Sequence, residues 1–309
     1  MDKNTNPSPA WQGTTDGLPW MHQALVRVLA VVPIGVIYAV AAIFVIPFYI
    51  IGNGQGRTSQ YRFFRQQMGY RPLRALWHVY VNHFRFAQVI IDRFAVYGGR
   101  RFTFEVDGLD DYNRLAEGDE GFVQVFSHTG NYELAGYELR QPRKRVYALL
   151  FSGETETIMQ QRASVFAPNG VEMVFVQPDM SHIFLLSNVV RDGDIASIPG
   201  DRIFGSKKFV ECQFLNDQAR FPLGPFQLAA VREAPIVALF VMKEGWSRYR
   251  IIVRTLGKAT DANRQSLGAR KQTIALAQEF VLELEKVVRR YPDQWFNYYD
   301  FWNASDAEV

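Results

Sequence analysis

A long apolar stretch without a charged residue is the feature that most restricts what this chain can fold into. It runs from Val28 to Ile51, 24 residues, and reads VLAVVPIGVIYAVAAIFVIPFYII. About 20 apolar residues in a helix span the hydrocarbon core of a bilayer, which is about 30 Å thick. We therefore predict a membrane-embedded helix within residues 23–53, preceded by a polar tail at residues 1–22.

This run has three alternative explanations besides a spanning helix. A core helix of a soluble domain rarely continues this far without a polar face. A cleaved signal peptide usually has a shorter apolar stretch, about 7–15 residues. Pro33 and Pro47 permit kinks, so a re-entrant or interfacial hairpin stays open beside the spanning helix.

The segment that follows, residues 54–100, is strongly basic and is predicted to be helical. Between residues 54 and 104 the chain has one acidic residue, Asp92, and nine arginines: Arg57, Arg62, Arg65, Arg71, Arg74, Arg85, Arg93, Arg100 and Arg101. Next to an apolar span, this favours contact with anionic lipid headgroups on the cytoplasmic side. Arginines among aromatic residues also suit nucleic-acid binding, but we expect no such partner because the whole chain carries only +3.

Residues 101–309 alternate short apolar runs with amphipathic stretches, which predicts an α/β domain with a mixed, largely parallel sheet flanked by helices. The predicted strands are 102–106, 122–127, 146–151, 171–176, 195–198, 209–214, 236–241 and 249–255. The predicted helices are 109–117, 131–140, 155–166, 180–191, 225–233 and 265–290. Cys212 is the single cysteine, which excludes an internal disulfide and a cysteine-rich zinc module. We expect no bound metal and no cofactor.

The candidate catalytic residue is His128, in the run FSHTGNYE. The preceding apolar strand ends there, at the strand edge where open α/β sheets place their ligands. Glu133 follows five residues later, in the first turn of the predicted helix, from where its carboxylate can reach the imidazole. A carboxylate at one ring nitrogen fixes the tautomer, and the other nitrogen can then take a proton from a hydroxyl.

The run GDEGFVQVFSHTGNYELAGYEL resembles the signature of the bacterial lipid A biosynthesis acyltransferases, within the H-x4-D/E lysophospholipid acyltransferase group. Four further segments resemble the same family: VDGLDDYNRL, GDIASIPGDR, FPLGPFQLAAVREAPIVALFVMKEG and YPDQWFNYYDFW. The resemblance implies an O-acyltransferase that is anchored in the inner membrane of a bacterium, with its catalytic domain on the cytoplasmic side.

The resemblance also implies the substrates and the residues that handle them. The donor would be a thioester of acyl-carrier protein or coenzyme A, and the acceptor a membrane lipid or glycolipid similar to lipid A. His128 would act as the general base with Glu133 as its partner. The residues implied for substrate binding are Asn131, Arg162, Asp201 and Arg202.

Two departures from the family pattern leave the acceptor open. Many members have an Arg-Pro pair after the strand that follows the motif, whereas here that strand, residues 147–153, reads YALLFSG. Asp201-Arg202 stands where many have Asp-Gln. Related branches acylate other lipids, such as phosphoglycolipids, and some occur beside polyene pigment pathways. A non-catalytic lipid-binding protein with the same fold is the alternative from another functional class.

Overall fold

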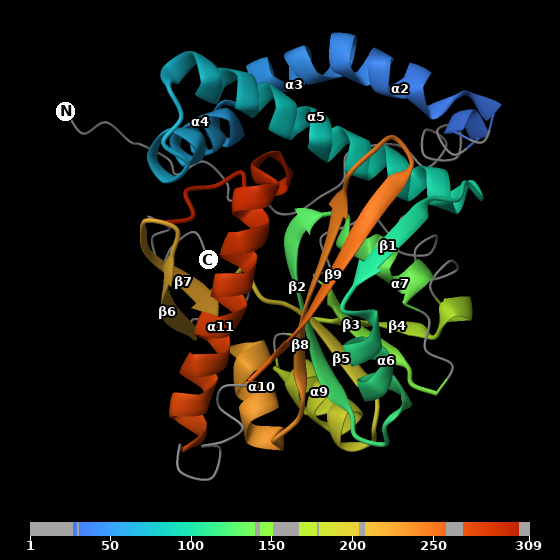
Figure 1. The fold of residues 1–309 in the computed structure, drawn as a ribbon, viewed down its shortest axis with the longest axis vertical. Coiled ribbons are helices and arrows are strands. Elements are labelled where there is room, and N and C mark those ends of the chain that lie inside the picture. The colour runs from blue at the N-terminus through green and yellow to red at the C-terminus, as the bar shows by residue number, and fades with distance from the viewer. Residues whose placement is uncertain are drawn as a thin grey trace.

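The computed structural model describes residues 27–29, 31–139, 143–150, 167–177, 179–203, 208–257 and 268–302. Its centre is a seven-stranded sheet in the order β1-β9-β8-β2-β5-β3-β4. The strands are β1 Thr103–Asp107, β2 Phe122–Gly130, β3 Val146–Leu150, β4 Val171–Phe175, β5 Ile195–Pro199, β8 Ile236–Lys243 and β9 Arg248–Leu256. Each neighbouring pair is parallel except β8 and β9. The predicted mixed, largely parallel sheet is therefore confirmed (Figure 1).

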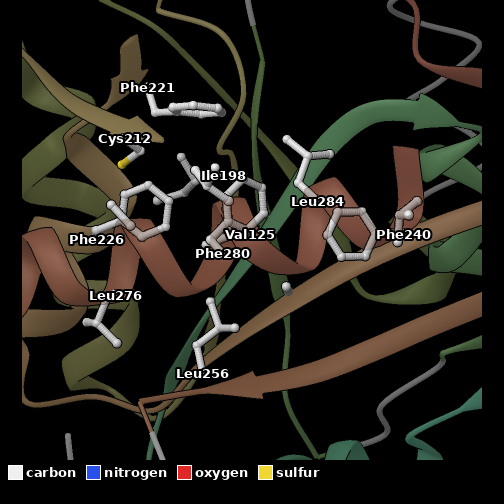
Figure 2. Packing of buried hydrophobic residues seen from close by; sticks show 14 of the residues in the cluster. Val125, Ile198, Cys212, Phe221, Phe226, Phe240, Leu256, Leu276, Phe280 and Leu284 are labelled. Atoms are coloured by element: carbon white, nitrogen blue, oxygen red, sulfur yellow. The ribbon is translucent and has the colours of Figure 1, made fainter. Parts of the chain in front are cut away.

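Helices cover both faces of the sheet, because the apolar side chains of β2 point alternately to one face and to the other. Val123 and Val125 belong to the core on the side of α9 Ser181–Arg191, α10 Gly224–Arg232 and α11 Ala269–Arg290. Phe122 belongs to the core on the side of α6 Leu109–Glu117 and α7 Ala135–Glu138. Figure 2 shows Phe280 of α11 beside Val125 and Ile198 in the first of these cores.

Most predicted elements in the described part of the chain are present, with two differences. The strand at 209–214 forms β6 Phe209–Phe214, which pairs only with β7 Asp217–Pro222 in a separate antiparallel hairpin. The helix expected at 131–140 is shorter: a 3-10 turn, η3 Tyr132–Leu134, followed by α7. The helix expected at 155–166 lies outside the described residues. The chain also contains two short 3-10 turns, η4 Ala167–Asn169 and η6 Pro292–Gln294.

The apolar run forms one helical rod that widens in its middle. It consists of α2 Ile34–Val40, the π-helical η1 Ala41–Val45 and α3 Ile46–Gly52. The Ile46 amide donates to the Ala41 carbonyl, five residues back. Pro47 lacks an amide hydrogen for the next helical bond, and the helix accommodates it by widening just before it. By length and composition this 19-residue rod could cross a membrane.

The rod covers α5 Pro72–Tyr97 with one side and leaves the other side open (Figure 1). Tyr38, Ala41 and Ile46 are buried on the covered side. The open side carries large apolar side chains that are roughly half exposed or more: Val36, Val40, Ile43, Phe44, Val45, Phe48, Tyr49 and Ile51. The first turns of α5 add Leu73, Leu76 and Trp77. A continuous apolar surface of this kind marks contact with a membrane or a partner.

A buried ion pair joins the rod, α5 and the sheet. Asp92 of α5, the single acid of the basic segment, accepts from the Lys243 ammonium of β8 at 2.5 Å, and both side chains are at most 1% exposed. The hydroxyls of Tyr38 and Tyr249 also donate to the Asp92 carboxylate. Burial raises the pKa of Asp92 and lowers that of Lys243, and their mutual attraction opposes both shifts. The four groups satisfy one another out of contact with water.

We predict that Lys243→Met lowers the free energy of unfolding by about 3–5 kcal/mol, because it leaves the Asp92 carboxylate buried without its cation. Thermal and urea unfolding of the full chain in detergent micelles measure the change. The double variant Asp92→Leu with Lys243→Met should recover part of the loss, since no isolated charge remains. Arg191→Met, which breaks an exposed ion pair with Asp192, is the control and should cost about 1 kcal/mol or less. A Lys243→Met protein as stable as this control would contradict the prediction.

Candidate active site

The carboxyl ends of two neighbouring parallel strands form the site. In the register of β2 and β5, Phe126 lies opposite Pro199. The residues that follow Phe126 and Pro199 therefore meet at the same edge of the sheet. His128 comes from β2, and Asp201 follows β5. The Gly200 amide donates to the Phe126 carbonyl at 2.8 Å, which continues the strand pairing up to the site. The fold thus brings together a histidine and an aspartate that are 73 residues apart.

Asp201 holds His128 in two ways. One carboxylate oxygen accepts from ring nitrogen Nδ1 at 2.7 Å, and the other accepts from the His128 backbone amide at 2.8 Å. The Asp201 side chain is fully buried, whereas the His128 side chain is 20% exposed. An ionised carboxylate at Nδ1 places the ring proton there and leaves Nε2 with its lone pair.

The expectation that Glu133 holds the His128 ring is wrong. The Glu133 carboxylate instead pairs with the Arg93 guanidinium of α5 at 2.9 Å, and the Tyr97 hydroxyl lies 3.5 Å from its second oxygen. The physical reason is the direction of the short turn η3, which carries Glu133 to α5, while β5 delivers Asp201 to the imidazole.

The electrostatics keep His128 neutral and Asp201 ionised. Burial lowers the pKa of His128, the nearby charge of Arg202 lowers it further, and Arg93 adds a smaller effect, against the opposing pull of Asp201. Burial alone would raise the pKa of Asp201, but its bonds to His128 and the charge of Arg202 outweigh burial and leave that pKa below its usual value. A neutral imidazole beside an ionised carboxylate is the resting state that a general base needs.

The turn after His128 is held by its backbone and by Asn131. Gly130 has a positive φ of 52°, and a Cβ there would lie 2.0 Å from the Val241 carbonyl oxygen, so the position requires glycine. The buried Asn131 side chain donates to the Val89 carbonyl at 3.3 Å and contacts the Tyr249 hydroxyl. Asn131, expected to bind substrate, therefore links the turn to α5 and to the sheet.

Arg202 joins the site to the last described segment of the chain. Its Nε donates to the Asn297 side-chain oxygen at 2.9 Å, and its Nη2 donates to the Phe296 carbonyl. The Phe296 amide in turn donates to the His128 carbonyl at 3.0 Å, and Trp295 forms a β-bridge with Thr129. The sequence pattern contains no signal for this arrangement, because the contacts join groups that are far apart along the chain.

An apolar cavity of about 70 Å³ adjoins the motif. The residues that line it include Tyr112, Gln124, Tyr132, Glu133 and Leu139. In the described part of the chain no three His, Cys, Asp or Glu side chains are grouped so as to hold a metal ion. Arg162, expected to bind an anionic substrate group, lies outside the described residues.

Comparisons with known proteins identify the family of the chain. No curated protein sequence matches the chain at a significant level. Among solved structures, the 1-acyl-sn-glycerophosphate acyltransferase PlsC from Thermotoga maritima is similar at 10% identity and a TM-score of 0.37, over 91% of this chain and 100% of that chain. The sequence model of the bacterial lipid A biosynthesis acyltransferases matches residues 98–303, about two thirds of the 309 residues. The chain therefore belongs to the bacterial lipid A biosynthesis acyltransferase family.

Proposed function

We propose that this protein transfers a fatty acyl chain from a thioester donor to a hydroxyl of a membrane lipid, with His128 as general base and Asp201 as its partner. One observation carries the proposal: Nδ1 of His128 is held by a buried carboxylate at the carboxyl edge of the sheet, within the region that matches the family. The donor is acyl-carrier protein or coenzyme A loaded with the acyl chain. The acceptor is a lipid or glycolipid similar to lipid A.

The reaction follows from a neutral imidazole with a free Nε2. This nitrogen takes the proton of the acceptor hydroxyl while the oxygen attacks the thioester carbonyl, and a C–O bond forms. The resulting imidazolium is stabilised by the Asp201 carboxylate. The oxyanion then collapses, the C–S bond breaks, and the leaving thiolate takes the proton back from His128. The products are an ester and a free thiol.

Glu133 and Arg93 have a supporting role in this proposal. Glu133 fixes the Arg93 guanidinium near the imidazole, close enough for its charge to lower the pKa of His128. Arg93 and Arg202 together give the site two positive charges, which favour the negative charge that develops on the thioester oxygen. The apolar cavity beside Tyr132 offers an environment for the start of the acyl chain.

The apolar rod and the exposed arginines support attachment to the cytoplasmic face of the inner membrane. Arg57, Arg65, Arg71 and Arg74 are exposed, and so are the apolar side chains of Leu73, Leu76 and Trp77. Other arginines serve the fold: Arg85 contacts Gln88, Arg93 contacts Glu133, and Arg100 donates to the carbonyls of Leu29 and Val32. Only part of the basic segment is thus available for anionic headgroups or for an acidic carrier protein.

We predict that Asp201→Asn lowers kcat by about 10²–10⁴, comparable to His128→Ala, because the ring loses the carboxylate that sets its tautomer. Glu133→Gln should lose less, since Arg93 keeps a hydrogen-bond acceptor. Acyl transfer from a radiolabelled long-chain thioester into lipid micelles measures all three. Glu172→Gln, at an exposed ion pair with Arg145, is the control and should match the wild type. A larger loss in Glu133→Gln than in Asp201→Asn would contradict the assigned pair.

The pH dependence of the reaction should report the neutral imidazole. Because the pKa of His128 is lowered, kcat/KM should stay constant down to about pH 6.5, the usual histidine pKa, and fall only below it as Nε2 becomes protonated. Arg202→Gln removes a cation that lowers this pKa, so the acidic limb should move to higher pH. Arg202→Lys keeps the charge and should leave the limb in place. A limb that stays fixed in Arg202→Gln would contradict the assignment.

Membrane attachment is tested at the open side of the rod. Phe48 is 81% exposed there, and Phe184 of α9 is 72% exposed on another part of the molecule. Phe48→Asp should weaken binding to anionic vesicles roughly a hundredfold in flotation assays, because an aspartate in the apolar region costs about 3 kcal/mol. Phe184→Asp is the matched control and should bind as the wild type does. Equal binding by both variants would show that the rod is not the attachment site.

A further inference from the structure

The folded domain covers the apolar rod in its middle and near its end. In the middle, the Tyr80 hydroxyl of α5 donates to the Ala42 carbonyl at 2.9 Å. Nearer the end, the centre of the Tyr49 ring lies 5.9 Å from that of His83, which is also on α5. Figure 1 shows α5 between the rod and the sheet. The rod therefore lies along the domain and does not project from it.

The start of the rod is held by the domain as well. The Arg100 guanidinium, just beyond the end of α5, donates to the carbonyls of Leu29 and Val32 at 3.0 Å each, directly ahead of the rod. The Trp246 ring, in the turn between β8 and β9, packs so closely on Gly35 that a Cβ there would overlap it. The domain thus contacts the rod at both ends and in its middle.

The helix beside the rod cannot enter the hydrocarbon core of a bilayer without cost. Residues 80–93 of α5 include three charged side chains, Arg85, Asp92 and Arg93. A rod that crossed the bilayer would carry this stretch of α5 to the same depth, together with the sheet behind it. A charged side chain at the bilayer centre costs about 2.5–3.5 kcal/mol or more. The packing therefore favours a rod that lies along the membrane surface over one that crosses the bilayer.

One side of the rod presents apolar side chains from its first turn to its last. Val36, Val40, Phe44 and Phe48 follow one another at spacings of four residues, and all four are exposed. This spacing keeps side chains on one face of a helix. A helix in the plane of a membrane buries such a face about 5–10 Å deep, at the boundary between headgroups and acyl chains. The open side of the rod suits this depth along its full length.

An exposed tryptophan of the domain lies toward each end of the rod. Trp246 is 65% exposed, although its ring packs on Gly35. Trp77, in the first turns of α5, is 62% exposed and stacks on Tyr80. Figure 1 shows the start of α5 beside α4 Gly54–Arg62, the helix that follows the rod. Tryptophan is enriched at the boundary between membrane and water, so both rings fit the same surface of one leaflet.

Exposed arginines also flank both ends of the rod. Those at the start are Arg27, Arg101 and Arg248, and those beyond the end are Arg57 in α4, Arg65 in η2 Phe63–Gln67, Arg71 and Arg74. A spanning helix has its excess of positive residues on the cytoplasmic side, at one end only. Positive charges at both ends instead match a single anionic surface, which attracts each nearby arginine by about 1 kcal/mol.

From these contacts we propose that the rod lies in the plane of one leaflet without crossing the bilayer, and that Trp246 and Arg248 of the β8–β9 turn form a second membrane contact. The inference rests on the proposed function, in which the protein works at the inner membrane, and it specifies how the domain is held there. Both ends of the rod and the β8–β9 turn then share the cytoplasmic leaflet, so acceptor lipids enter the site from that leaflet.

The sides of the membrane on which the two ends of the rod lie distinguish a rod in the plane from one that crosses. Single cysteines are placed before the rod by Ser8→Cys and after it by Thr58→Cys, in a full chain whose buried Cys212 is replaced by alanine. A membrane-impermeant maleimide is added to sealed inside-out vesicles and to spheroplasts of a bacterium that expresses each variant, and detergent-solubilised protein is the positive control. We expect both cysteines to react only in the inside-out vesicles. Reaction of the two cysteines from opposite sides would overturn the inference.

Variants of the β8–β9 turn test the second contact. Arg248→Glu should weaken binding of the full chain to anionic vesicles about tenfold or more, because it removes one attraction and adds one repulsion, and high salt should abolish the difference. Arg114→Glu, at an exposed arginine of α6, is the matched control and should bind as the wild type does. Trp246→Asp should weaken binding to neutral vesicles as well, whereas Phe184→Asp should not. Binding at the wild-type level by both Arg248→Glu and Trp246→Asp would overturn the second contact.

These outcomes separate the inference from the proposed function. A protein that has both cysteines on the cytoplasmic side but transfers no acyl chain would refute the proposed reaction and leave the in-plane rod standing. A protein that transfers acyl chains and has its two cysteines on opposite sides would refute the in-plane rod alone. Two cysteines that react only in spheroplasts would support a rod in one leaflet and would refute the cytoplasmic side assigned to it.

Discussion

The parallel pairing of β2 with β5 is the constraint on which the site depends. It aligns Phe126 with Pro199, and from there two short extensions bring His128 and Asp201 into contact. The bond to the His128 backbone amide adds to the bond to the ring, so the aspartate orients both the main chain and the imidazole. Because the carboxylate is fully buried, its charge is opposed only by groups that the fold places there, chiefly the imidazole and Arg202. The contact between His128 and Asp201 therefore depends on the register in which β2 and β5 pair.

Helix α5 applies a second constraint through two consecutive residues. Asp92 pairs with Lys243 at the end of β8, and Arg93 pairs with Glu133 in the turn that follows β2. The helix is thus fastened to the sheet on one side and to the catalytic motif on the other. Tyr38 extends the same cluster into the apolar rod, so any tilt of the rod against the sheet must break a buried hydrogen bond. The open side of the rod and the edge of the sheet that carries His128 are therefore linked through buried contacts.

Periodicity and turn residues predicted most of the fold, because the α/β domain buries its strands in continuous apolar runs. They missed β7, whose sequence DQARFP is half polar and is buried only at Ala219 and Phe221. In the site, the motif around His128 was visible in the sequence, and so was Asp201 at a second strand end. Their pairing was not visible, because a spacing of five residues suggests a local contact with Glu133, whereas the actual contact depends on how β5 lies beside β2. Local spacing cannot report such a register.

The bridge between Thr129 and Trp295 has a consequence for how the protein is made. The strand that carries His128 gains its last backbone partner from a segment at residues 295–296, near the end of the described chain. Synthesis delivers domains from the amino end first, so the rod at Ile34–Gly52 leaves the ribosome long before that partner exists. The rod can therefore be complete while the edge of the sheet that carries His128 still lacks its last backbone partner.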